Sequence, residues 1–139
     1  MKTKRIIKDQ KGGALVEFVI VLPLLVLLAF GIIEFGTLLY DQSVITNASR
    51  EGARAGITQK VDTGGITNIV NTYCTNRLIN FSGGSVLPTT IFPNGDNIGK
   101  SSGVDFSVKV TYDYTMLVSQ LFGLGSTRTL YAKTLMYME

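Results

Sequence analysis

The residues whose types and spacing most clearly point to chemistry stand at the start of a long apolar stretch, in the sequence GGALVEF. Gly12 and Gly13 open it, and Glu17 lies five residues after Gly12. A glycine lets another molecule approach the backbone closely, because it has no side chain. A carboxylate that enters lipid without a partner is costly, about 2.5–3.5 kcal/mol for aspartate at the centre of a membrane helix. Glu17 therefore needs a cationic partner, or its side chain must reach back to the lipid headgroups.

Other catalytic and ligand-binding chemistry has little support in the sequence. The chain contains no histidine, which excludes Ser-His and Cys-His nucleophile pairs. Its single cysteine, Cys74, cannot form an intrachain disulfide, and a zinc ion would lack most of its usual ligands. The glycine pairs lack the following Lys-Ser/Thr of a phosphate-binding loop. We therefore expect a protein that is not an enzyme and that needs no cofactor and no metal.

Positive charge is concentrated at the N-terminus. The first twelve residues hold five basic side chains and one acidic side chain, a net charge of +4, whereas the rest of the chain sums to −1. A basic cluster directly before an apolar run keeps an N-terminus on the cytoplasmic side of a membrane. Without this leader no basic face is left, so nucleic-acid binding is not expected.

The apolar run covers residues 13–33 and is long enough to cross a membrane. As a helix it would measure about 31 Å, close to the roughly 30 Å thickness of the hydrocarbon layer. Pro23 lies inside the run, but membrane helices tolerate proline better than soluble helices do. We predict a transmembrane helix. The alternatives are a cleavable secretory signal that ends near residues 29–31 and a helix buried in a protein core.

The helical pattern continues beyond the apolar run, so residues 34–57 are predicted to extend the same helix on the extracytoplasmic side. Glu34 is interpreted as a marker of the point where the membrane ends. Asp41 is assigned, with other polar residues, to faces of the helix away from its apolar side.

A ridge of small residues lies near the end of this extension, with Ala48, Gly52 and Gly56 spaced four apart. Small residues at this spacing let another backbone come close, which predicts a helix-packing surface. The alternative is that the two glycines only mark fraying toward the end of the helix.

Residues 58–139 predict a small α+β head that begins after a polar, glycine-containing break. Apolar residues at helical spacing indicate an amphipathic helix over residues 66–81, with Cys74 on its packed stripe. Residues 82–103 are rich in Gly, Ser, Pro and Asn and are predicted to form a long loop, with a short strand near residues 89–92.

The clearest strand signal in the head is an alternation of apolar and polar side chains in residues 104–114, which recurs in residues 126–138. Two strands of this length with a short connection are predicted to pair antiparallel. Their apolar face would pack on the helix of residues 66–81 or on the outer half of the long helix. The predicted fold is a long membrane helix followed by a small α+β head with an amphipathic helix and an antiparallel strand pair.

The basic leader, Gly12, the four residues after it and Glu17-Phe18 together resemble the processing motif of prepilins. The longer sequences GGALVEFVIVLPLLVLLAFGIIEFG and NASREGARAG resemble the TadE-like family, the minor pseudopilins of tight-adherence (Flp-type) pilus assembly. Phe18 departs from the tyrosine that is usual at this position in Flp-type pilins, although it keeps an aromatic ring.

The resemblance implies that a prepilin peptidase cuts between Gly12 and Gly13 and that Glu17 becomes the fifth residue of the mature subunit. It further implies that Glu17 and Phe18 serve assembly, with Glu17 paired to the first amine of a neighbouring subunit. The implied partners are the major pilin, other minor pilins, the peptidase, the inner-membrane assembly platform and membrane lipid. The implied function is that of a structural subunit in the bacterial inner membrane that contributes to a pilus for surface adhesion. The alternative is an uncleaved single-pass protein whose head binds an envelope or extracellular partner.

Overall fold

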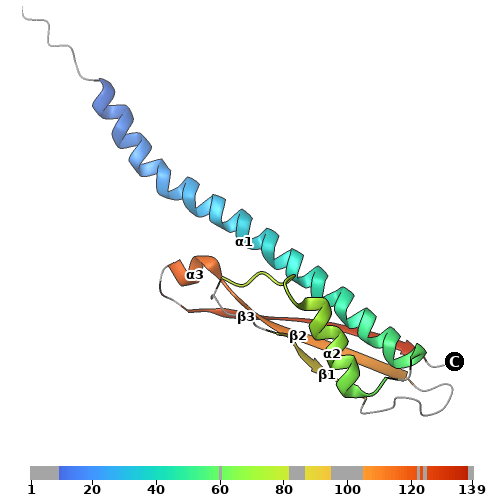
Figure 1. The fold of residues 1–139 in the computed structure, drawn as a ribbon. Helices are drawn as coiled ribbons and strands as arrows, with labels where there is room; N and C mark the ends of the chain where they lie inside the picture. Colours follow the sequence, from blue (N-terminus) through green and yellow to red (C-terminus); the bar gives the residue numbers. More distant parts are fainter. Residues whose placement is uncertain are drawn as a thin grey trace, which may run out of the picture.

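A computed structural model describes residues 10–59, 61–81, 87–94, 105–121, 123 and 125–137 of the chain. Helix α1, Gln10–Thr58, is one uninterrupted helix of 49 residues, about 73 Å long at the usual rise per residue. Pro23 lies inside it without ending it. Figure 1 shows that the N-terminal half of α1 projects away from the rest of the molecule, whereas its C-terminal half lies against a small head. The predicted long helix is confirmed.

In the described residues, the head has two further helices and three strands, namely α2 (Thr63–Cys74), β1 (Thr89–Ile91), β2 (Asp105–Thr115), α3 (Leu117–Leu121) and β3 (Thr127–Tyr137). The strands form one antiparallel sheet in the order β1-β2-β3. β2 and β3 pair over their whole length, from Asp105 opposite Tyr137 to Thr115 opposite Thr127. The predicted α+β class is confirmed, and the short strand expected near residues 89–92 becomes the third strand of the sheet.

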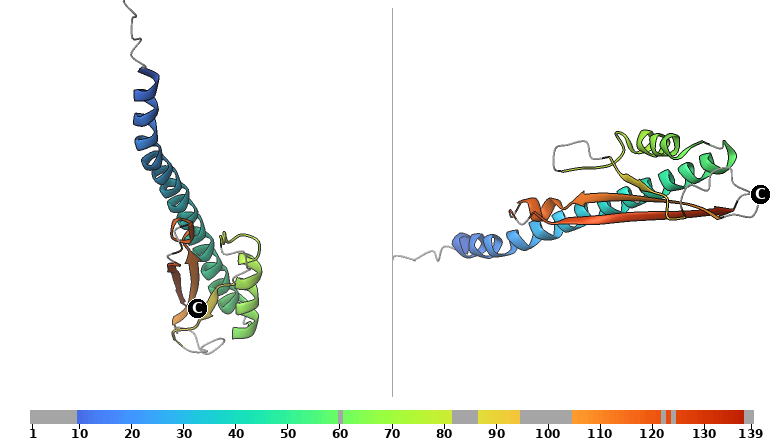
Figure 2. Two further views of the ribbon diagram at one scale, coloured as in Figure 1. Left: turned by 90° about the vertical axis from the view of Figure 1, so that its left-hand side faces the viewer. Right: turned by 90° about the horizontal axis from the view of Figure 1, so that it is seen from below.

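The sheet packs on the outer half of α1, one of the two predicted arrangements. Figure 2 shows β2 and β3 running along α1, with α2 beside the outer end of the same helix. Alternate side chains of β2 point inward and are buried, as the sequence alternation predicts: Phe106, Val108, Val110, Tyr112 and Tyr114. They form one core with buried residues of the two helices: Val44, Ile45, Ala48, Ile66 and Val70.

Helix α2 begins and ends earlier than the predicted range of residues 66–81. Its start is fixed by Asp62, whose carboxylate accepts a hydrogen bond of 2.9 Å from the Gly65 N–H. The helix ends at Cys74, and Asn76 takes the left-handed backbone conformation, φ 61°, that is common just after a helix. Phe81 is outside the helix, yet its ring packs edge-on against Tyr114 with centroids 6.5 Å apart. The apolar stripe therefore predicted packing correctly and the end of the helix wrongly.

The two halves of α1 have different surroundings. From Gly12 to Ile33 its side chains are exposed, apart from a half-buried Phe30, and no residue of its most apolar window is buried within the molecule. By length and composition this half can cross a membrane. The described residues of the head do not cover this half, so among them it is not a core helix. From Glu34 onward α1 packs against the head, and many of its side chains are buried there.

Candidate functional site

Gly12, Gly13, Glu17 and Phe18 all lie near the start of α1, on the half of the helix that projects from the head. All four are exposed, and a side chain added at either glycine would meet no atom within 4 Å. Gly13 and Glu17 are four residues apart and therefore occupy one face of the helix, one turn from each other. Glu17 makes no hydrogen bond or ion pair with the part of the chain that the structure describes. The carboxylate is thus presented outward from an otherwise apolar surface.

The peptide bond between Gly12 and Gly13 is inside α1, which begins at Gln10. Each glycine lowers helix stability by about 1 kcal/mol relative to alanine, so two in succession make this turn easy to unwind. The glycine pair is therefore a weak point near the start of the helix.

The ridge of Ala48, Gly52 and Gly56 lies about 54 Å or more along α1 from Gly12, and it serves the interior of the head. A methyl group added at Gly52 would come within 2.9 Å of Val70 of α2, and one at Gly56 within 2.5 Å of the Phe106 ring of β2. Ala48 is itself completely buried. The ridge is thus a place where α2 and β2 closely approach α1, and α1 continues past it to Thr58 without fraying.

Comparison with known families finds a similarity over most of α1. Residues 12–54 match the family model described as TadE-like protein. The match begins at Gly12 and includes Ala48 and Gly52 of the small-residue ridge. Residues 12–54 form a TadE-like segment. The predicted family resemblance is therefore confirmed for this part of the chain, and it supports a protein related to tight-adherence (Flp-type) pili, a family of structural proteins. No curated protein and no solved structure matches the chain.

The TadE-like segment also carries three polar residues that face the head, Glu34, Thr37 and Asp41. Glu34 Oε2 accepts a hydrogen bond of 3.4 Å from the Val118 N–H of α3. The Thr37 hydroxyl lies 2.7 Å from the hydroxyl of Tyr114 on β2. We call these three residues the polar seam, because they join α1 to the head along one face of the helix.

The polar seam corrects two sequence interpretations. Glu34 does not only mark the end of the membrane, since it also contacts α3, and one of its oxygens, Oε1, is buried without a partner among the described residues. Asp41 was assigned to a polar face, but it is completely buried. The spacing of three and then four residues could have revealed that all three share one face. The shared face was missed because two of the three residues are acidic, and acidic residues are rarely buried.

Asp41 holds the chain segment that follows α2. Its Oδ1 accepts a hydrogen bond of 3.0 Å from the Ile79 N–H, and the hydroxyl of Tyr112 donates to the Ile79 carbonyl at 3.2 Å. Asp41 Oδ2 is buried and has no partner among the described residues. Burial raises the pKa of Asp41 above its ordinary value of 3.8, and the hydrogen bond from Ile79 offsets part of this effect.

Replacement of Asp41 by asparagine is expected to stabilise the head at neutral pH, because the amide oxygen can still accept the hydrogen bond from the Ile79 N–H while no charge has to be buried. A raised pKa in the folded state favours the protonated form, so the contribution of Asp41 is present below its ordinary pKa of 3.8 and is lost as the pH rises through the raised value. The gain from asparagine should therefore appear above about pH 4 and increase toward neutrality. Denaturant unfolding of both proteins in detergent across this pH range measures it. A difference that does not change with pH would contradict the assignment.

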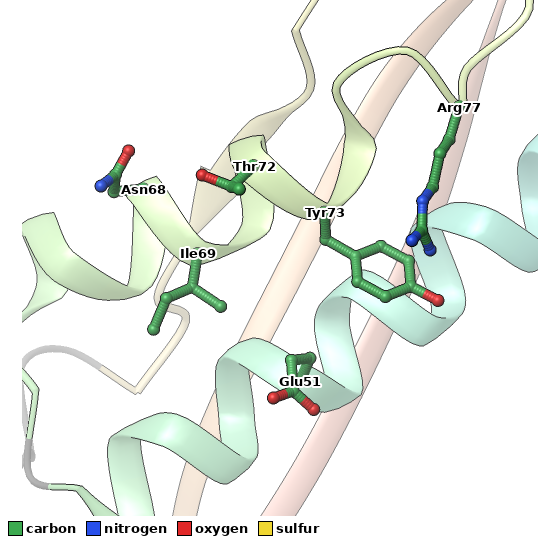
Figure 3. A pocket seen from close by; sticks show the side chains of 6 residues that line it. All are labelled: Glu51, Asn68, Ile69, Thr72, Tyr73 and Arg77. Carbon is green, nitrogen blue, oxygen red and sulfur yellow. The ribbon is translucent and has the colours of Figure 1, made fainter.

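A shallow groove lies between α1 and α2 on the surface of the head (Figure 3). Its volume is about 350 Å³, and it is lined by Glu51, Asn68, Ile69, Thr72, Tyr73 and Arg77. The Arg77 guanidinium lies over the Tyr73 ring, 4.4 Å from its centroid. Glu51 is paired with Arg54 at 2.8 Å, and the hydrogen bonds from Arg54 lower the pKa of Glu51. The six lining residues offer hydrogen bonds and an aromatic ring, but no nucleophile beside a base.

Cys74, the single cysteine of the chain, lies in the core of the head at the C-terminal end of α2 and is 2% exposed. Burial raises its pKa to about 11. The thiol is therefore neutral at physiological pH and is a poor nucleophile. This placement agrees with the packing role that its position on an apolar stripe predicted.

Proposed function

We propose that this protein is a minor pseudopilin, a structural subunit without enzymatic activity that contributes to assembly of a tight-adherence (Flp-type) pilus for surface adhesion. The observation that carries the proposal is the exposed Glu17, which stands unpartnered on an apolar helix half inside a TadE-like segment. A simple membrane anchor gains nothing from a carboxylate at this position, since the charge opposes insertion. A subunit that must be recognised by another subunit does gain from it.

The same arrangement supports a bacterial inner-membrane location before assembly. The apolar half of α1 crosses the bilayer once, the basic leader of residues 1–12 stays in the cytoplasm, and the head lies on the extracytoplasmic side. This orientation places Gly12 and Gly13 at the cytoplasmic face of the membrane. The prepilin peptidase is the partner that acts there.

Removal of the leader creates the partner that Glu17 needs. Cleavage frees a positively charged amine on Gly13, and a protonated amine is the chemical complement of a carboxylate in a medium of low dielectric constant. We assign this role to the amine of a neighbouring subunit, with Phe18 packed beside the pair. The neighbouring subunits are the major pilin or other minor pilins, delivered by the inner-membrane assembly platform.

Intact mass spectrometry of the protein extracted from membranes of a piliated strain tests the processing step. We expect the mass of a chain that begins at Gly13, without residues 1–12. A matched Gly12→Leu variant should keep its leader, because a bulky side chain prevents close approach of the peptidase to the backbone.

A mass that includes the leader, in cells that assemble pili, would exclude processing. It would leave the TadE-like assignment intact and would favour an uncleaved membrane protein whose head binds an envelope or extracellular partner.

A further inference from the structure

The end of the head that carries α3 lies at the level where the apolar run of α1 ends. The Val118 N–H of α3 donates to Glu34, and Glu34 directly follows Ile33, the last residue of the run. The next contact, between Tyr114 and Thr37, lies only three residues farther along α1, about 4.5 Å. Figure 1 shows α3 at the end of the head nearest to the projecting half of α1. No spacer therefore separates the head from the predicted membrane boundary.

The opposite side of α1 carries an apolar surface at the same level. Phe35 and Leu39 are 63% and 52% exposed, although both follow the apolar run. Leu39 lies about 9 Å beyond Ile33, and helical side chains point back toward the N-terminus. The headgroup layer on each side of a bilayer is about 5–8 Å thick. Both side chains therefore reach this layer, and water would cover them if the bilayer were farther away.

The described residues around α3 have the mixed composition of a lipid interface. Met116, Leu117 and Val118 are half-buried apolar residues, and Gln120 is exposed. Arg128 stands opposite Tyr114 in the sheet register and is exposed, so its backbone lies at the level of the contact between Tyr114 and Thr37, and its long side chain is free to reach lipid. An arginine beside apolar side chains suits lipid phosphates, with which it forms paired hydrogen bonds. The carboxylate of Glu34 is shielded beneath α3, because its Oε1 is buried.

We propose that α3 and the start of β3 rest in the headgroup layer of the membrane that holds α1, with Arg128 bound to lipid phosphate. The inference rests on the membrane insertion proposed above. It makes the lipid surface a second contact of the head, in addition to the α1 tether, and it limits the orientations that the head can take before assembly. A subunit leaving the membrane must release this contact as well as its apolar helix.

Spin labels on the full chain in vesicles of phosphatidylcholine and phosphatidylglycerol test the proposal. Single cysteines replace Gln120 on α3, Asn68 on the outer part of α2, or Leu25 in the span, in a Cys74→Ala background. Asn68 lies beside Glu51, about 25 Å beyond Glu34 along α1. We expect the Gln120 label to lose most of its accessibility to a water-soluble nickel reagent and to gain accessibility to oxygen, whereas the Asn68 label stays fully accessible to nickel.

A charge reversal separates lipid binding from simple proximity. Arg128→Glu should restore nickel accessibility at Gln120, whereas the matched Lys133→Glu, on the same strand but farther from α3, should not. Equal accessibility of the Gln120 and Asn68 labels, with the Leu25 label in lipid, would overturn the inference alone. A Leu25 label exposed to water would overturn the membrane insertion as well.

Discussion

Replacement of Gly56 by leucine is expected to destabilise the head by about 3 kcal/mol or more, near the upper end of the cost of overpacking a core. The Cβ atom alone would lie 2.5 Å from Cε1 and 2.9 Å from Cζ of Phe106, and 3.0 Å from Ile66. Phe106 is completely buried, so its ring cannot move aside without disturbing the sheet. The gain in helix propensity, about 1 kcal/mol, does not offset this cost. Since domains are stable by only about 5–15 kcal/mol, a large fraction of the stability of the head would be lost.

Gly36→Leu is the matched control, because Gly36 lies in the same helix and a Cβ there would meet no atom within 4 Å. It should be neutral or slightly stabilising. Pulse proteolysis of both variants in detergent, or hydrogen exchange of β2, gives the free energy of unfolding of the head. A Gly56→Leu protein as stable as the Gly36→Leu protein would show that the ridge does not set the distance between α1 and the sheet.

The secondary structure of the head was largely predictable, because its apolar residues follow the helical repeat in α2 and the two-residue repeat in β2 without interruption. The alternation in residues 104–114 predicted β2 and the face that it buries, since a half-buried strand repeats every two residues. The C-terminal end of α2 was not predictable in the same way. Leu78 and Phe81 continue the apolar spacing and do pack against the core, but they do so from an irregular segment after Asn76 turns the backbone. The spacing of apolar residues therefore predicts which side chains are buried, but it does not show where the helix ends.

The positions of the candidate assembly residues near the start of α1 were predictable, because they depend on local order in the sequence; their role stays a prediction. Gly12, Gly13 and Glu17 lie within six positions, fewer than two helical turns, and their exposure follows from their place on the projecting half of the helix. The polar seam was not predicted, because its partners lie far away in the chain. Glu34 meets Val118, and Asp41 meets Ile79, only after the sheet has folded back along α1. From hydropathy, the carboxylates of Glu34 and Asp41 were expected to face water, whereas in the folded chain they lie between α1 and the head.

Replacement of Glu17 by alanine is expected to leave membrane insertion intact and to reduce surface pili by about tenfold or more. Insertion should not suffer, because removal of a charge from a membrane helix lowers its cost of entry. Assembly should suffer, because the amine of the neighbouring subunit would then enter lipid without its carboxylate. A loss of about 1.4 kcal/mol in the contact between subunits already corresponds to a tenfold change in its equilibrium constant, and an unpaired charge in lipid costs more than that.

Val16→Ala is the matched control for Glu17→Ala, since Val16 is the adjacent residue and is 59% exposed on the same helix half. Membrane fractionation measures insertion, and shear preparation of surface filaments measures assembly. Glu17→Asp tests the length of the side chain separately from its charge. It keeps the carboxylate on a side chain that is one bond shorter, and it should retain part of the assembly, because the attraction in a charge pair weakens gradually with distance. Normal piliation in the alanine variant would refute the assembly role of Glu17. Glu17 would then act only by reaching the headgroups, and the exposed carboxylate would carry no information about a partner subunit.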